Sequence, residues 1–468
     1  MIHKILECWN QAALLPDDRN RLIIWLECLR ADIDYERIET FLELLLHTKA
    51  LQTEEKLMLY WQVNGMLFTC TGIPDSVKYK KLTLWKYMSD CYCKNFSNLQ
   101  RIENRRADVV LVTVQQFLSM THGPTKTVLD RAYVLTQMGK KVFILNTAEL
   151  YGGNMSGIKQ PIKASYLEDL SQYDELEYLG VKLPYLQFEN DMPNKQGTQL
   201  FLEYLNELRP SYIVNVGGES LTLDCAARLI PVLNINTVPS TIVPSLATKQ
   251  VIGRKINKED CSFLNCLGLQ QDSVIESRFT SSLNQQKRKY SRVELSIPEQ
   301  CFAIAVVGAR LTQEVDLEFV RMLEPVLCAG GYLVIIGKMD SYEELCEKSH
   351  ILKEQSIHMG MQTDVLAILE CCDMYVNPKR IGGGTSVIEA MYKGLPVVTL
   401  DYGDVSLGAG EDFCVSDYEE MRKSILHYMT DTRFYAEMSK RARERAEYML
   451  DSKKAFEELI NEFEKQIS

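Results

Sequence analysis

The residues best placed for chemistry lie in one stretch near the end of the sequence, from Asp373 to Leu400. A short apolar run, Met374–Asn377, is typical of a buried parallel strand. A basic, glycine-rich loop follows, and the hydroxyl pair Thr385 and Ser386 then opens a helix. Backbone N–H groups and the positive end of the helix dipole meet at such a helix start, so the pattern predicts a phosphate-binding turn.

Glu389 adds a carboxylate about one helical turn beyond those two hydroxyl groups. A carboxylate beside bound phosphate suits the hydroxyl groups of a ribose, and the stretch therefore predicts a site for a nucleotide diphosphate. Glycine lets a ligand approach the backbone closely, and the loop offers Gly382, Gly383 and Gly384. The alternative is a loop that needs glycine only to make its turn.

Alternating strand and helix patterns precede this stretch and must position it. Cys301–Val307 is an apolar run that leads to Arg310, and Tyr332–Ile336 is another that leads to Lys338. We expect a helix over Val315–Cys328 between them. The sequence thus predicts a parallel sheet whose strands end, at one edge, in the loops that carry these basic residues.

An earlier part of the chain has the same texture. Asp108–Val114 and Lys141–Leu145 read as buried strands around an amphipathic helix, and Tyr212–Glu219 is a further strand that runs into a loop. Two consecutive parallel α/β domains, joined by a polar linker at Thr280–Lys289, would form a cleft between facing carboxyl ends of their strands. Residues 1–106 read instead as helical throughout, either a packing or dimerisation domain or an extension that binds an acceptor.

Composition excludes several classes of protein. The 468 residues are enough for two or three domains, and 46% hydrophobic and 25% charged residues are ordinary for a soluble globular chain. A net charge of −11 argues against nucleic acid as a partner. Fourteen cysteines without a CxxC pair, no signal peptide and no apolar run of transmembrane length predict a cytoplasmic protein with reduced thiols and no integral membrane segment.

The second α/β region resembles the group 1 family of nucleotide-sugar glycosyltransferases, which share the two-Rossmann GT-B fold. The segments that carry the resemblance are Leu295–Glu299, Ala303–Leu311, Ile335–Gly337, Asp373–Pro378 and Glu389–Val398. As a set they are specific for the fold and its donor domain. The resemblance is weaker over residues 107–290 and absent over the first hundred.

The resemblance implies roles for several residues. Arg310 matches an arginine that contacts the donor diphosphate, Glu389 matches the glutamate that holds the ribose, and the turn at Met359 and Gly360 would touch the base through its backbone. The family's second phosphate-binding lysine is missing from the loop after Arg310. Lys338, Lys379 or Arg380 would supply that charge instead, together with the turn at Gly382, Gly383, Gly384, Thr385 and Ser386.

One departure bears on the stereochemistry. The first glutamate of the family's paired motif falls at Ile381, which puts a retaining mechanism in doubt. The pair Thr385 and Ser386 also resembles the protein O-GlcNAc transferases and related bacterial N-glycosyltransferases. Those enzymes are inverting, and the bacterial ones carry an N-terminal helical domain, which fits residues 1–106.

The resemblance implies transfer of a sugar from a nucleotide diphosphate donor, UDP-linked, to a protein or glycan acceptor. Arg310 and the helix start would stabilise the departing diphosphate, so we expect no metal and no cofactor beyond the donor. His122 and Glu219, each in a loop after a strand, are the candidate general bases. The alternatives are a nucleotide-sugar epimerase of the same fold and a non-catalytic GT-B-like partner subunit.

We therefore expect an α/β protein of the GT-B class, with two Rossmann-like domains facing a cleft and an all-α domain before them. The expected segments are an N-terminal helical domain at 1–106, an acceptor domain at 107–285, a donor domain at 286–435, and C-terminal helices at 436–468 that pack back across the domains. A homo-oligomer formed through the N-terminal helices is one further expectation.

Overall fold

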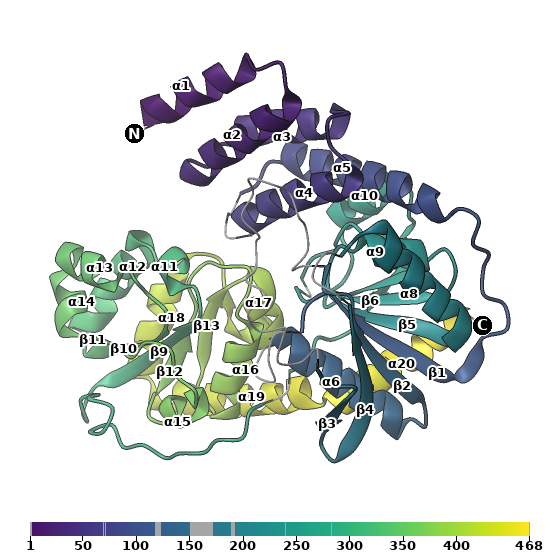
Figure 1. Cartoon of the computed structure of the whole chain (residues 1–468). Helices are drawn as coiled ribbons and strands as arrows, with labels where there is room; N and C mark the ends of the chain where they lie inside the picture. The colour runs from purple at the N-terminus through teal and green to yellow at the C-terminus, as the bar shows by residue number, and fades with distance from the viewer. Residues whose placement is uncertain are drawn as a thin grey trace. The chain divides into compact units, whose positions relative to one another are not determined.

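The computed structural model describes residues 2–68, 70, 72–117, 123–149, 172–188, 192–238, 240–281 and 283–467. The chain forms two compact units. The first unit is Met1–Ser277 together with Phe456–Ser468, and the second is Arg278–Ala455. Figure 1 labels their helices and strands in chain order.

The first unit begins with the helical segment that the sequence predicts (Figure 1). Its helices are α1 Ile2–Ala13, α2 Asp18–Ala31, α3 Tyr35–His47, α4 Thr53–Leu67, α5 Asp75–Cys93 and the short 3-10 helix η1 Lys94–Phe96. This segment shares a hydrophobic core with the sheet that follows it. In that core, Trp85 Nε1 donates to Asp224 Oδ2 at 3.0 Å, and the hydroxyl groups of Tyr92 and Thr198 lie 2.8 Å apart.

The sheet of the first unit has the order β3-β4-β2-β1-β5-β6-β7-β8. Its pairs are parallel except for the antiparallel pair β3 and β4. The strands are β1 Arg106–Val114, β2 Lys141–Asn146, β3 Glu175–Tyr178, β4 Val181–Gln187, β5 Pro210–Val216, β6 Val232–Ile235, β7 Lys249–Ile252 and β8 Val274–Glu276.

Side chains of β1 alternate between two cores, as the period of a strand requires. Val109 and Leu111 belong to the core that contains the N-terminal helices, α8 and α9, whereas Val110 and Val112 belong to the core that contains α6 and α20. The bounds of these helices and of their neighbours are α6 Gly123–Gln137, α8 Lys195–Leu208, α9 Leu221–Ala226, α10 Lys258–Leu267, η4 Gln271–Ser273 and α20 Ser452–Ile467.

The sheet of the second unit has the order β11-β10-β9-β12-β13-β14, with every pair parallel. The strands are β9 Phe302–Gly308, β10 Gly331–Gly337, β11 Ser356–His358, β12 Met374–Val376, β13 Val397–Leu400 and β14 Cys414–Val415. This is the strand order of a doubly wound Rossmann sheet, in which the order reverses between β9 and β12. Ligands of such sheets bind beyond the carboxyl ends of the strands at that reversal.

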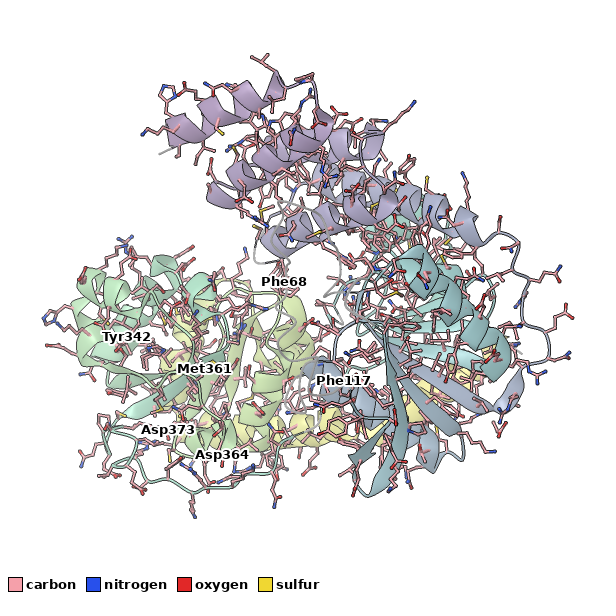
Figure 2. All side chains as sticks on the ribbon, in the orientation of Figure 1. Phe68, Phe117, Tyr342, Met361, Asp364 and Asp373 are labelled. Carbon is pink, nitrogen blue, oxygen red and sulfur yellow. The ribbon has the colours of Figure 1, made fainter. Side chains whose placement is uncertain are left out.

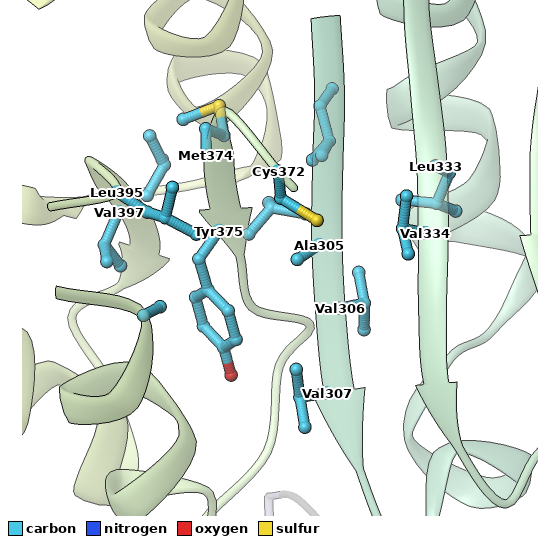
Figure 3. Packing of buried hydrophobic residues seen from close by; sticks show 14 of the residues in the cluster. Ala305, Val306, Val307, Leu333, Val334, Cys372, Met374, Tyr375, Leu395 and Val397 are labelled. Atoms are coloured by element: carbon cyan, nitrogen blue, oxygen red, sulfur yellow. The ribbon is translucent and has the colours of Figure 1, made fainter. Parts of the chain in front are cut away.

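Helices cover this second sheet, and its central strands β9, β10 and β12 are buried (Figure 3). The helices are α11 Leu311–Glu314, α12 Leu317–Cys328, α13 Tyr342–Lys348, α14 His350–Glu354, α15 Val365–Leu369, α16 Gly384–Tyr392, α17 Gly403–Ala409, η5 Glu411–Phe413, α18 Tyr418–Thr430 and α19 Thr432–Leu450. The helix predicted at Val315–Cys328 is wrong at its start. It begins at Leu317, because Asp316 caps it by accepting from the N–H of Phe319 at 2.8 Å.

The same kind of cap begins several other helices. An aspartate side chain accepts a backbone N–H of the first turn in each case. These aspartates are Asp17, Asp34, Asp364, Asp417 and Asp431. The breaks predicted near Asp431 and Leu450 are confirmed, since α18, α19 and α20 are separate helices.

The segment predicted as a linker has no helix or strand in its described residues, and it is held along the second unit. Asp364 accepts the backbone N–H groups of Lys287 at 2.7 Å and Arg288 at 2.9 Å. Asp373 pairs with Arg292 at 2.6 Å, which fastens the next part of the segment. Figure 2 labels both aspartates.

Candidate functional site

The structure brings Arg310 and the triple-glycine turn together at the carboxyl edge of the second sheet. Arg310 follows β9, and the turn follows β12, the two strands at which the order reverses. A Cβ atom placed on Gly382 would lie 3.3 Å from Nη2 of Arg310. The cation and the glycines, predicted from separate parts of the sequence, are therefore neighbours.

The turn ends in a helix start suited to an anion. Gly383 has a φ of +108°, and α16 begins at Gly384. The first N–H groups of a helix have no partner within that helix, and the dipole makes this end positive. Thr385 is exposed and Glu389 is partly exposed, four residues further on the same face of α16. A hydroxyl group and a carboxylate thus lie beside the helix start.

Ser386 differs from its neighbour. Its side chain is only 9% exposed, and its hydroxyl donates to the carbonyl oxygen of Gly383 at 2.8 Å. The same hydroxyl lies 3.0 Å from Tyr375 Oη. Of the two hydroxyl groups predicted at the phosphate, that of Thr385 is exposed, whereas that of Ser386 holds the turn from within.

Arg380 lies in the interior beneath the turn. Its Nε donates to Asn377 Oδ1 at 2.7 Å, and Nη1 lies 2.8 Å from Glu314 Oε2. Its Nη2 donates to the Val307 carbonyl at 2.8 Å and to Tyr375 Oη at 2.9 Å. Figure 3 shows the Tyr375 hydroxyl at the end of the sheet where Val307 lies.

These partners keep Arg380 charged. Burial alone lowers its pKa, but the Tyr375 hydroxyl and the Glu314 carboxylate raise the pKa above its ordinary value. We expected Arg380 to touch the ligand directly. Because its guanidinium is committed to internal acceptors, its charge instead acts on the turn from below.

The two lysines offered as the second cation differ in their surroundings. Lys338 follows β10, is 62% exposed and pairs with Asp340 at 3.2 Å. Its backbone is joined to α11, because Thr312 N donates to the Lys338 carbonyl at 3.3 Å. Lys379 Nζ lies 5.8 Å from the centre of the Tyr402 ring. Lys338 therefore lies in a loop that contacts α11, the helix that follows Arg310.

The turn at Met359 and Gly360 joins the same edge. Gly337 N donates to the Gly360 carbonyl at 2.8 Å, and Met359 N donates to the Ile335 carbonyl at 2.9 Å. The ring of His358 donates from Nε2 to the Gly337 carbonyl at 2.8 Å, which assigns its tautomer. The loops after β9, β10, β11 and β12 thus end at one edge.

Of the two candidate bases, His122 lies outside the described residues. Glu219 is partly exposed, and its Oε1 accepts from Tyr60 Oη and from Asn64 Nδ2, each at 3.3 Å. Burial lowers the pKa of the nearby Lys81, and the charge of Glu219 opposes that shift. The contact between Glu219 and the N-terminal helix α4 was not predicted from the sequence.

Sequence analysis also missed the residues that support the turn. Tyr375 and Asn377 read as ordinary strand residues, and Glu314 was assigned no role. One signal was present: Glu314 follows Arg310 by four residues, the spacing of an ion pair on a helix. The contacts of Arg380 with three separate segments had no such local signal.

The described residues contain neither a metal-binding cluster nor a membrane-spanning helix. Within the described ranges, no group of three or more His, Cys, Asp or Glu side chains is arranged to hold a metal ion. In the same part of the chain, no helix has both the length and the apolar character needed to cross a membrane.

Part of the second unit is similar to a known protein family. Residues 304–431 match the family model of the group 1 glycosyl transferases. This match spans β9 to α18 and contains every predicted donor-site residue from Arg310 to Glu389. No curated protein sequence matches the chain.

Solved structures extend the likeness to the rest of the fold. A glycosyltransferase from Rickettsia africae ESF-5 superposes with a TM-score of 0.55 at 12% identity, over 78% of this chain and 99% of that one. HepE of Anabaena in complex with UDP gives 0.54 at 12% identity, over 76% and 99%.

An O-GlcNAc transferase mutant of Thermobaculum terrenum gives a TM-score of 0.53 at 12% identity and covers 98% of this chain and 93% of that one. The helical segment before the first sheet is therefore part of this alignment. The family match and these folds agree with the resemblance seen in the sequence: the chain has the GT-B fold, and its residues 304–431 match the model of the group 1 glycosyl transferases.

Proposed function

We propose that this protein transfers a hexosyl or N-acetylhexosaminyl group from a UDP-linked sugar to a protein or glycan acceptor. The observation that carries the proposal is the position of Arg310 beside Gly382 at the start of α16, with Glu389 on the exposed face of that helix. The cation and the helix start suit a diphosphate, and the carboxylate suits the hydroxyl groups of a ribose.

The chemistry follows from where charge develops. The bond from the sugar to the diphosphate breaks, and the departing phosphate gains negative charge in the transition state. Arg310 and the first N–H groups of α16 would stabilise that charge, with Lys338 as the second cation. Because these groups supply the positive charge, the proposal includes no metal. Met359 and Gly360 would contact the base through their backbone.

The structural likeness guides the choice of donor. HepE of Anabaena was solved with UDP, which supports a UDP-linked donor for this chain. The O-GlcNAc transferase aligns along 98% of this chain, its N-terminal helices included, which favours N-acetylglucosamine as the first sugar to test. His122 and Glu219 remain the proposed general bases that deprotonate the acceptor.

A panel of nucleotide sugars tests the donor site directly. We expect hydrolysis or transfer with at least one UDP-sugar, and a decrease of about 10- to 100-fold in kcat/KM for Glu389→Ala, the loss expected when a charged hydrogen bond to the ribose is removed. Glu347→Ala, at an exposed position on α13, is the matched control and should have wild-type activity.

Wild-type turnover by a folded Glu389→Ala protein would refute the ribose assignment. The epimerase alternative predicts a different product: enzyme incubated with UDP-N-acetylglucosamine alone would yield an isomer of the sugar rather than free UDP. NMR of that reaction separates the two activities and also reports the anomer that transfer produces.

A further inference from the structure

Glu314 connects two arginines at the edge of the second sheet. Its Oε1 lies 3.3 Å from both Nε and Nη2 of Arg310, and its Oε2 lies 2.8 Å from Nη1 of Arg380. The side chain of Glu314 is 8% exposed and comes from the single turn α11. One carboxylate thus uses one oxygen for each arginine.

The two arginines lie in different environments. The Arg380 side chain is 4% exposed and holds the triple-glycine turn from within, whereas the Arg310 side chain is 44% exposed and reaches toward Gly382. Glu314 therefore connects the exposed Arg310 side chain to the buried Arg380 side chain. An arginine whose guanidinium is already oriented loses less conformational freedom when it binds a diphosphate.

A carboxylate near a phosphate site would ordinarily weaken anion binding. Here the ion pair with Arg380 offsets the charge of Glu314, because the two groups are 2.8 Å apart and shielded from solvent. The three side chains together still carry one positive charge. Orientation of Arg310, rather than repulsion by Glu314, should dominate the effect on binding.

We infer that Glu314 is a positioning residue, which orients Arg310 toward the diphosphate of the donor while its second oxygen stays on Arg380. This inference rests on the proposed function, since it takes the ligand of Arg310 to be a nucleotide diphosphate. It gives a role to a glutamate in the segment after Arg310, where the family's second phosphate-binding lysine is missing.

A double-mutant cycle tests the inference, with UDP as the probe and calorimetry as the measurement. Glu314→Gln keeps the shape of the side chain but removes its charge, and we expect UDP to bind about tenfold more weakly. In the Arg310→Ala background the same change should alter UDP affinity by less than about twofold, because the group through which Glu314 acts is gone. Glu318→Gln, exposed on α12, is the control and should bind UDP as wild type does.

Thermal unfolding distinguishes positioning from a general loss of structure. Glu314→Gln should lower Tm in both backgrounds, since the contact with Arg380 is lost in each. Its effect on UDP should appear only where Arg310 is present. Should Glu314→Gln fail to fold, Glu314→Asp keeps the charge but is one methylene too short to serve both arginines, and it enters the same cycle.

Three results would each contradict a different part of this inference. An equal loss of UDP affinity in both backgrounds would mean that Glu314 acts through the fold alone. Tighter UDP binding by Glu314→Gln would mean that its carboxylate competes with the diphosphate. Failure of the folded wild-type protein to bind UDP would instead refute the proposed donor.

Discussion

Nη1 of Arg380 lies 2.8 Å from Oε2 of Glu314, and both side chains are less than a tenth exposed. The pair lies beneath the triple-glycine turn, where a Cβ atom on Gly383 would meet Nη2 of Arg380 at 2.7 Å. The predicted phosphate site is therefore built above a buried ion pair. The stability of the fold around this site should depend on that pair.

Replacement of Arg380 tests that dependence. Arg380→Met removes one partner of a buried pair, and Glu314 and three further acceptors each lose the bond that Arg380 donates. We expect the free energy of unfolding to fall by roughly 3–5 kcal/mol. Urea denaturation measures it, with Arg433→Met, at an exposed position of α19, as the control. A loss below about 1 kcal/mol would show that the pair is not important for stability.

Gly383 and Gly330 form a matched pair for the turn itself. Both have left-handed backbones, with φ of +108° and +103°, but a Cβ on Gly330 meets no atom within 4 Å. Gly330→Ala should cost about 1 kcal/mol through backbone strain alone. In Gly383→Ala the new Cβ also clashes with Arg380. This variant should therefore lose more free energy of unfolding than Gly330→Ala, and it should also bind UDP more weakly. Similar unfolding curves for the two variants would contradict the close approach.

The adjacent hydroxyl groups of Thr385 and Ser386 should separate binding from stability. Thr385→Ala removes an exposed group beside the helix start, and we expect roughly fivefold weaker UDP binding with unchanged Tm. Ser386→Ala removes the donor to the Gly383 carbonyl and should destabilise the fold by about 1 kcal/mol. Calorimetry and thermal unfolding of both variants give the comparison; the reverse assignment of effects would mean that Ser386 faces the ligand.

Asp224 should make the stability of the first unit depend on pH. Burial raises the pKa of this carboxyl to about 7, against the hydrogen bonds from Leu246 N and Trp85 Nε1, which lower it. The folded state therefore keeps a proton that the unfolded chain loses above pH ~4. Stability from this group is fully present below pH ~4 and is lost as pH rises through about 7.

Asp224→Asn cannot titrate, which isolates the effect. At pH 5 the variant should be less stable than wild type, since Trp85 Nε1 loses a carboxyl acceptor at 3.0 Å. Between pH 5 and 8 the deficit should shrink, by on the order of 1–3 kcal/mol, at about 1.4 kcal/mol per pKa unit. Urea denaturation at both pH values measures the difference. A deficit that grows with pH would contradict the sign of the shift.

Local patterns were sufficient for the elements and for much of the site. The apolar run at Met374–Asn377 contains strand β12, Met374–Val376, and the spacing from Gly382 to Glu389 predicted a turn, a helix start and a carboxylate in the right order. Strand order placed Arg310 beside that turn, because two parallel strands at the reversal end at the same edge. The GT-B fold followed from the same motifs and is confirmed.

What local patterns could not reveal is which polar side chains lie inside. Arg380 and Lys379 are neighbours in a basic loop, yet only Arg380 turns inward, since Asn377, Tyr375 and the Val307 carbonyl together satisfy its donors. Those partners come from two strands that the sheet brings together, and burial of a charge is stable only when all of them are in place. The order of residues alone was enough to predict the segments and their chemistry, whereas long-range packing settled which charged side chain is exposed beside the turn and which is buried beneath it.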